Sequence, residues 1–361
     1  MTDRERFLRL MNYEPVDRHP IHLVEPWSDT LHRWRSEGLP ADVSDVHDYL
    51  GIPRLRAVNI VGVFPFYPKF KTRILESNDT FEISIDTDGR TVRNFKDHTS
   101  MPEWIDFPVK DGRDLRQVMD EHLDIDDLEA RFGSEFEGSL RQKTHDHPDA
   151  LVITNGGGYY WILRSLAGVE QASYLFYDEP ELVDELFERI FVLVMEGLRR
   201  VTDRVQVDVL GYGEDIACKT GPLMDPAMVR KMILPRYRAA LDAAHRNGID
   251  LTWYDSDGDC RMLLPDFLSI GINGIAPCEV AAGMDPVELR KTFGRNLRLI
   301  GGFDKRIVAA GKEAIEAEFL RLRPVIDEGG FLPAIDHSVS SDISWDNYRH
   351  FLDAVQRYSG H

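Results

Sequence analysis

The sequence contains few cysteines, and none of them form a closely spaced pair. Its 361 residues include three, Cys218, Cys260 and Cys278, which lie far apart with no CxxC motif. A disulfide framework is typical of short secreted chains with an even cysteine count, so this odd number in a long chain argues for a reducing compartment. We therefore expect a cytoplasmic protein.

Long hydrophobic runs are also lacking. No stretch reaches the roughly 20 apolar residues that a membrane-spanning helix needs. The opening residues, MTDRERFLRL, lack the apolar core of a signal peptide and instead predict a capped helix, with Thr2 as N-cap and Glu5 three residues later. The sequence thus predicts no membrane association.

Positive charge is scarce. Lys and Arg total 43 against 62 for Asp and Glu, which gives a net charge of -19. A chain this acidic repels phosphate backbones and anionic lipid surfaces. We therefore expect a small-molecule substrate and neither nucleic acid nor membrane as a partner.

From about residue 150 onward, short β-rich runs alternate with long amphipathic segments. Strand, helix and strand at this spacing predict parallel βαβ units. A doubly wound sheet and a closed barrel both fit, but no glycine fingerprint of a dinucleotide fold follows any run, since NGGGYY lacks the spacing. The barrel is therefore favoured. The runs lie at residues 150–155, 205–212, 249–254, 272–277, 297–302 and 330–335.

The prediction is a single domain over residues 1–361, an α/β fold of the (β/α)8 TIM-barrel type with an N-terminal helix. Residues 21–24, IHLV, are taken as its first strand. The less regular region at about 60–150 is interpreted as an insertion. Within it, FEISIDTDGRTVRNF predicts a β-hairpin with a type I′ turn at Asp88-Gly89.

Polar residues follow the predicted strands, at the end where a barrel of this type carries its active site. Gathering so many like charges is costly unless a cation or a proton compensates them, so the pattern indicates a metal, shared protons or a cationic substrate. The plainer alternative is that the loops of an acidic protein are acidic, or that Asp255 or Asp259 caps a helix. The residues are Glu25, Glu214, Asp215, Asp255, Asp257, Glu279 and His337.

A calcium loop at DSDGD (255–259) is not expected. The required sixth-position glycine of an EF-hand would fall on Cys260 and the twelfth-position glutamate on Asp266.

Four segments resemble the uroporphyrinogen decarboxylase superfamily, and more specifically its cobalamin-related methyltransferase branch. They are RERFLRLMNYEPVDRHP, GYGEDIACKTGPLMDPAMVRKMILPRY, GGFDK at 301–305 and IDHSVSSDISWDNYRHFL. The resemblance runs in order along nearly the whole chain and implies a (β/α)8 barrel. Decarboxylases of the family carry an arginine-rich motif after the first strand. Here that place reads HLVEPW, with Glu25, so a polyanionic porphyrinogen is not the expected substrate.

The resemblance also implies a metal site. Corrinoid-linked methyltransferases of the branch bind zinc through a His-x-Cys pair after one strand and a cysteine after the last, and these positions align with Asp255, Asp257 and His337 here. We predict Asp257, Glu279 and His337 as ligands of a divalent metal. Zinc is the first choice, and the harder donor set also suits iron or manganese.

The remaining candidate residues are assigned to catalysis or to substrate binding. Glu214, Asp215 and Asp255 are the predicted catalytic residues, as a general base or a substrate anchor. Substrate binding is assigned to Glu25, Tyr159 and Trp253, and the two aromatic residues equally suit the core.

Two functions follow from this interpretation. The first is a corrinoid-linked methyltransferase component, in which a metal polarises the leaving heteroatom of a small methylated substrate and a corrinoid on a separate protein accepts the methyl group. The alternative is a cofactor-independent decarboxylase or lyase that acts on a non-porphyrin substrate. A non-catalytic receptor for a cationic ligand and a homodimer are kept open.

Overall fold

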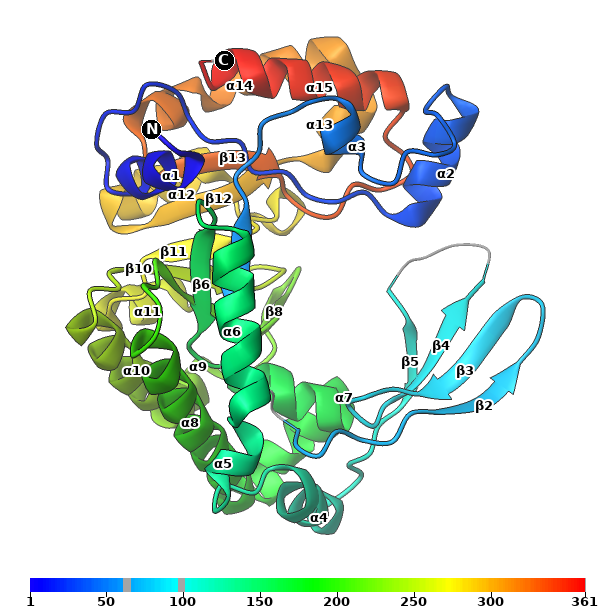
Figure 1. Cartoon of the computed structure of the whole chain (residues 1–361), viewed down its shortest axis with the longest axis vertical. Helices are drawn as coiled ribbons and strands as arrows, with labels where there is room; N and C mark the ends of the chain where they lie inside the picture. The colour runs from blue at the N-terminus through cyan, green and yellow to red at the C-terminus, as the bar shows by residue number, and fades with distance from the viewer. Residues whose placement is uncertain (61–65, 97–100, 361) are drawn as a thin grey trace.

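The main sheet has seven parallel strands. The computed structural model describes residues 1–60, 66–96 and 101–360. Neighbouring strands are sequential along the chain throughout, and the sheet curls into a half-barrel, so the fold is α/β and consistent with a TIM-like architecture (Figure 1). The order is β1 (Ala57–Ile60), β6 (Leu151–Asn155), β7 (Val209–Gly213), β10 (Leu251–Asp255), β11 (Gly274–Ala276), β12 (Arg298–Phe303) and β13 (Phe331–Ile335).

All six runs predicted after residue 150 are strands, but the first strand was predicted in the wrong place. Residues 21–24 form no strand, and the sheet begins at β1. The segment is nevertheless hydrogen-bonded on both sides: the N–H of Leu55 donates to the carbonyl of Ile21 (2.7 Å), and Pro26 forms a parallel bridge with Val339. Pro20 directly before this segment and Pro26 shortly after it have no backbone N–H to donate, which interrupts a regular ladder.

The inner face of the sheet is apolar where the strands begin, and the first helix covers it. α1 (Asp3–Met11) has the predicted capping box between Thr2 and Glu5. Its apolar face packs on inward side chains of the strands and seals this end of the sheet, so the carboxyl ends remain for a site. The cluster contains Phe7, Leu10, Met11, Leu55, Leu151, Val209, Leu251, Ala276, Ile300 and Leu332.

Helices cover the outer face. Alternate strand residues such as Val152, Leu210 and Tyr254 point outward into a second, larger core with these helices. The helices after β6 are α7 (Tyr159–Asp178), α8 (Pro180–Thr202), α9 (Pro226–Met228), the π-helix η1 (Val229–Ile233), α10 (Leu234–Arg246), α11 (Leu264–Ile270), the 3₁₀ helices η2 (Val280–Ala282) and η3 (Gly294–Asn296), α12 (Pro286–Phe293), α13 (Lys305–Ala310), α14 (Lys312–Glu328) and α15 (Trp345–Tyr358).

A four-stranded antiparallel sheet projects from the body (Figure 1). β3 pairs with β4 as the hairpin expected at 81–95. The predicted type I′ turn is wrong: it needs positive φ at two central residues, and of Asp88 and Gly89 the glycine alone has it. The Asp86 carboxylate instead accepts the N–H groups of Asp88 and Arg90. The strands are β2 (Arg73–Ser77), β3 (Phe81–Ile85), β4 (Thr91–Phe95) and β5 (Glu103–Asp106).

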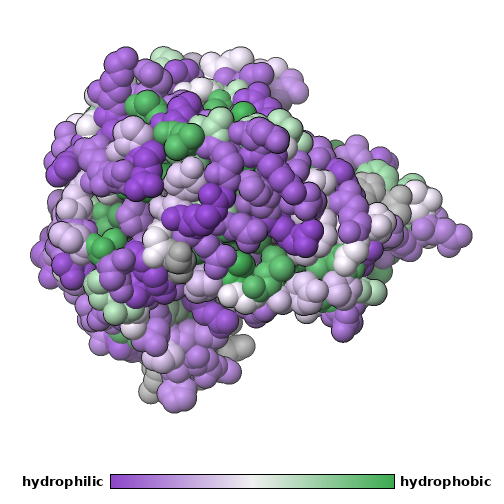
Figure 2. Space-filling view, turned by 90° about the horizontal axis from the view of Figure 1, so that it is seen from above, coloured by the Kyte–Doolittle hydropathy of each residue, from purple (hydrophilic) through white to green (hydrophobic). Residues whose placement is uncertain are grey.

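Shorter helices complete the part of the chain before β6. They are α2 (Ser28–Ser36), α3 (Val46–Tyr49), α4 (Gly112–His122), α5 (Leu128–Arg131) and α6 (Ser134–Asp146). After β7, β8 (Ala217–Cys218) and β9 (Gly221–Pro222) form a small antiparallel ribbon. Within the described ranges, no helix combines the length and apolar composition that crossing a membrane requires. Figure 2 shows one face that is mainly hydrophilic with scattered apolar spots.

Candidate active site

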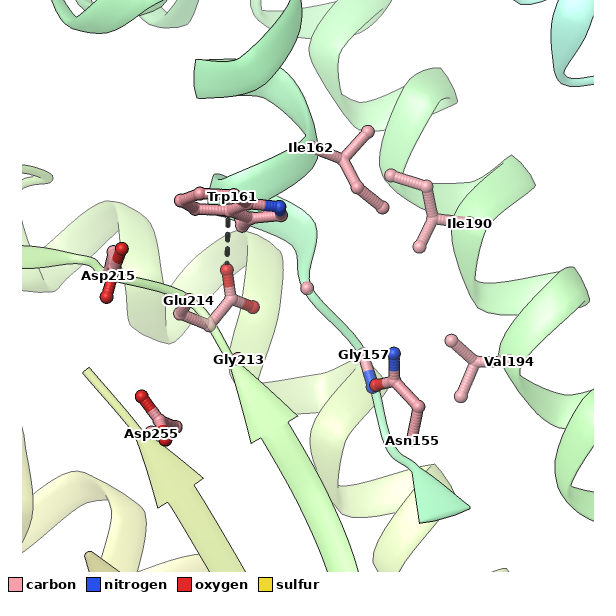
Figure 3. Close-up of a pocket in the computed structure, with 11 residues that line it drawn as sticks. Asn155, Gly157, Trp161, Ile162, Ile190, Val194, Gly213, Glu214, Asp215 and Asp255 are labelled. Carbon is pink, nitrogen blue, oxygen red and sulfur yellow. Dashed lines mark hydrogen bonds between the residues drawn. The ribbon is translucent and has the colours of Figure 1, made fainter. Parts of the chain in front are cut away.

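A pocket of about 370 Å³ lies where β6, β7 and β10 end and α7 begins (Figure 3). One side is apolar and comes from α7 and α8, and the other carries carboxyl groups from the strand ends. None of the lining residues is a lysine, arginine or histidine. They are Asn155, Gly157, Gly158, Trp161, Ile162, Ile190, Val194, Gly213, Glu214, Asp215 and Asp255.

Glu214 is buried, and both of its carboxyl oxygens accept hydrogen bonds. The N–H of Tyr159 donates to Oε1 (2.8 Å), the N–H of Trp161 to Oε2 (3.0 Å), and the hydroxyl of Tyr237 also donates to Oε1. Burial raises the pKa of Glu214 to about 7, against these donors, which lower it. Since Gly158 precedes α7 without a side-chain cap, Glu214 caps the first turn of the helix.

Asp215 has a positive φ of 43° and is held by an arginine that the sequence interpretation did not single out. Nη1 of Arg164 donates to its carbonyl oxygen (2.8 Å), and Nη2 lies 3.5 Å from its carboxylate. Burial and the charge of Asp257 raise the pKa of Asp215, while Arg164 lowers it. Arg164 lies within α7 rather than directly after a strand. An interpretation based on residues at strand ends therefore could not find it.

Asp255 ends β10 and opens into the pocket beside Asp215 (Figure 3). Its backbone neighbours across the sheet are Gly213 and Ala276. Desolvation by the surrounding protein, followed by the charges of Asp215 and Asp257, raises the pKa of Asp255 to about 7. A carboxyl group with this pKa exchanges a proton near neutral pH.

Two of the three predicted metal ligands contact each other. Nε2 of His337 lies 3.5 Å from Oδ2 of Asp257, and this hydrogen bond raises the pKa of His337. Oε2 of Glu279 accepts the N–H of Gly258 (3.0 Å). Gly258 has a φ of +83°, and a Cβ there would lie 2.7 Å from the backbone of Ala217 and Cys218, so this tight turn requires glycine.

These side chains do not fit a three-ligand metal site as they stand. Among the described residues, no three His, Cys, Asp or Glu side chains are grouped so that they could hold a metal ion. Of the three predicted ligands, Asp257 and His337 form an ion pair with each other, whereas Glu279 is directed to the Gly258 amide. The arrangement itself supports hydrogen-bonding and proton-transfer chemistry.

The three predicted substrate-binding residues lie outside the pocket lining. Tyr159 is fully buried and packs against Phe187 and Tyr237. Trp253 points to the inner face of the sheet and stacks on Phe7 of α1, with His22 at its edge. Glu25 is exposed, and its Oε1 lies 3.3 Å from Nη1 of Arg54.

Comparisons with known proteins agree with the fold. A methyltransferase from Methanosarcina mazei shares it with a TM-score of 0.61 and 14% sequence identity, over 99% of each chain. No curated protein matches the sequence. The family model described as "Uroporphyrinogen decarboxylase (URO-D)" matches residues 121–358, well over half of the chain. The chain therefore belongs to the uroporphyrinogen decarboxylase family, as its four motif segments indicated.

Proposed function

We propose that this protein is a methyltransferase-type enzyme that removes a methyl group from a small substrate bound in the pocket. The observation that carries the proposal is Asp255, a carboxyl group that opens into a partly apolar pocket and titrates near neutral pH. The family and the shared fold of the Methanosarcina mazei methyltransferase support it. The methyl acceptor is a corrinoid carried by a separate protein, as the sequence resemblance implies.

The proposed step needs one proton from the protein. The reaction breaks the bond between the methyl carbon and the heteroatom, and the heteroatom keeps the bonding electron pair. A corrinoid on its partner protein would supply the nucleophile that takes the methyl carbon. Asp255 donates its proton to that heteroatom, which makes it a better leaving group. Burial, followed by the charges of Asp215 and Asp257, raises the pKa of Asp255 to about 7, so a large share of the molecules carry this proton at neutral pH.

The neighbouring residues position the acid. Arg164 fixes the backbone of Asp215, and the N–H of Asp257 lies 3.3 Å from Oδ1 of Asp215. Ile162, Ile190 and Val194 supply the apolar wall against which a methylated group can pack. No step is assigned to a metal, because the predicted ligands do not form a three-ligand site.

We also propose that residues 21–26 take the place of the eighth barrel strand. The hydrogen bond from Leu55 and the bridge to Val339 support this position between β1 and β13. Trp27, which follows, has its ring edge-on to His337 at 5.9 Å and would complete the rim.

The test is a methyl-transfer assay with chemically reduced cobalamin as the acceptor. A panel of small O-, N- and S-methylated compounds is incubated with the enzyme, and methylcobalamin formation is followed by its visible spectrum. Enzyme-dependent methylcobalamin with one class of compound is the expected result. Release of CO₂ from a carboxylated compound, without methyl transfer, would instead support the decarboxylase alternative.

A further inference from the structure

Strand β2 lies at a free edge of the projecting sheet. Its one strand neighbour in the described part of the chain is β3, and all five of its residues are exposed. Two large apolar side chains, Ile74 and Leu75, are 61% and 46% exposed at its centre. An edge with unpaired backbone groups and apolar side chains is a surface on which another strand can pair.

The register of β2 places two opposite charges on one face of the sheet. Arg73 pairs with Ile85 and Glu76 pairs with Ile83, with an irregularity between Ile74 and Glu76. Ile83 and Ile85 are two residues apart and so point to the same face. Arg73 and Glu76 therefore share that face, although residues three apart in a regular strand point to opposite faces.

We propose that the β2 edge is a self-association surface, on which β2 of a second copy of this chain pairs antiparallel. A two-fold axis normal to the sheet, between Ile74 and Leu75, sets Arg73 of each copy opposite Glu76 of the other. Ile74 then lies opposite Leu75 of the second copy. Such an isologous contact uses the same patch twice, and it requires the two charged residues to lie on one face, as they do here.

An exposed edge strand can either pair with another strand or be protected against such pairing, and the charges on β2 favour pairing. Charged side chains and bulges also protect edge strands, because like charges repel an incoming strand. Here the approach of a second β2 brings opposite charges together at two symmetric positions, and cross-strand pairs of this kind are favourable. The irregularity in β2 therefore makes the edge complementary to itself.

The sheet is also connected to the pocket. The ring of Trp104 in β5 meets the ring of Trp161, which lines the pocket, at 6.1 Å. The guanidinium of Arg164 lies over both rings, at 5.5 and 4.9 Å from their centroids. Pairing of two copies through β2 would hold this sheet steady beside the catalytic carboxylates, but the inference does not depend on the proposed reaction.

The experiment is a mass measurement by light scattering after size exclusion, on the full chain over a range of concentrations. The expected mass is twice that of the 41.4 kDa chain. In the dimer of either single variant, Arg73→Glu or Glu76→Arg, residues 73 and 76 carry like charges at both symmetric contacts between the copies. Each substitution should therefore raise the dimer dissociation constant about tenfold or more. The double variant, Arg73→Glu with Glu76→Arg, should restore the dimer because it exchanges the two charges.

Glu313→Arg, an exposed residue on α14, is the matched control for altered net charge and should leave the dimer unchanged. Far-UV circular dichroism establishes that each variant is folded. A monomer at all concentrations overturns the proposal. A dimer whose dissociation constant is unchanged by both single substitutions also overturns it, because that dimer would use another surface. Failure of the double variant to restore the dimer overturns it as well.

Discussion

At the scale of single residues, two neighbouring carboxyl groups reach the same pKa of about 7 in different surroundings. Glu214 is buried with three donors on its oxygens, whereas Asp255 opens into the pocket next to two other aspartates. The first is fixed by its hydrogen bonds and the second is free to act on a ligand. Hydrogen bonding and exposure, rather than residue type, therefore distinguish Glu214, which is held at the start of α7, from Asp255, the proposed acid.

Asp255→Asn should reduce the rate of methyl transfer by roughly 10²- to 10⁴-fold, because the amide cannot donate the proton. In the wild type, activity should fall as pH rises through about 7, where Asp255 loses its proton. The residual activity of the variant should not show this fall in rate above pH 7. Rate profiles between pH 5 and 9 check both expectations, and equal pH dependence in the two proteins would exclude Asp255 as the acid.

Stability provides the control for this variant. Because the native state raises the pKa of Asp255, it binds this proton more tightly than the unfolded state, and the contribution of Asp255 to stability decreases as pH rises from about 4 to 7. Asn carries no charge to desolvate. Above pH 7 the variant should therefore be as stable as the wild type or more stable by about 1 kcal/mol, a value kept small because the side chain is exposed to the pocket.

His337→Ala separates an ion pair from a metal site. The pKa of His337 is raised by Asp257, so the pair stabilises the protein below the ordinary histidine pKa and this contribution is lost as pH rises through the higher folded value. The geometry predicts a melting temperature lower by roughly 1–2 °C at pH 6 and unchanged at pH 9, with equal metal content. Elemental analysis that finds stoichiometric metal in the wild type and none in the variant would assign His337 as a ligand.

At the scale of elements, the start of α7 depends on Glu214. Glu214→Gln replaces an acceptor with an NH₂ group that would face backbone N–H donors of Tyr159 or Trp161. A buried donor without an acceptor costs about 1–3 kcal/mol, so the variant should unfold at lower denaturant concentration. Asp203→Asn, at the exposed end of α8, is a control that should leave the midpoint unchanged.

The strands after residue 150 could be predicted, because each is a short apolar run between long helical patterns. β1 could not: AVNI is short, half exposed, and paired with β6 across almost a hundred residues. The turn at Asp88-Gly89 was misread because Asp-Gly suggests type I′, whereas Asp86 closes a longer loop with its carboxylate. Strand-end reasoning found the acidic cluster, but Arg164 and the capping role of Glu214 depend on contacts that no spacing records.

At the scale of the whole molecule, the charge distribution argues against the anionic substrate that the name of the family suggests. The chain belongs to the uroporphyrinogen decarboxylase family, yet it carries a net charge of -19. Its pocket is lined by three carboxyl groups and no cationic side chain. Glu25, expected to repel an anionic substrate, lies beside Arg54 and outside the lining. Under the proposed function, Asp215 is instead the lining carboxylate placed to repel such a substrate.

The protein should not convert uroporphyrinogen to coproporphyrinogen above background. A substrate with many carboxylates would have to approach Asp215, and above about pH 7 also the ionised Asp255, in a pocket where no arginine or lysine lines the wall. Like charges at close range disfavour binding strongly. The pocket of about 370 Å³ is also at the small end of the range for ligand sites, which suits a compact compound. Chromatography of the porphyrins after anaerobic incubation measures the outcome, with a known uroporphyrinogen decarboxylase as the positive control. Steady formation of coproporphyrinogen, abolished in Asp255→Asn, would show that these carboxyl groups serve decarboxylation instead.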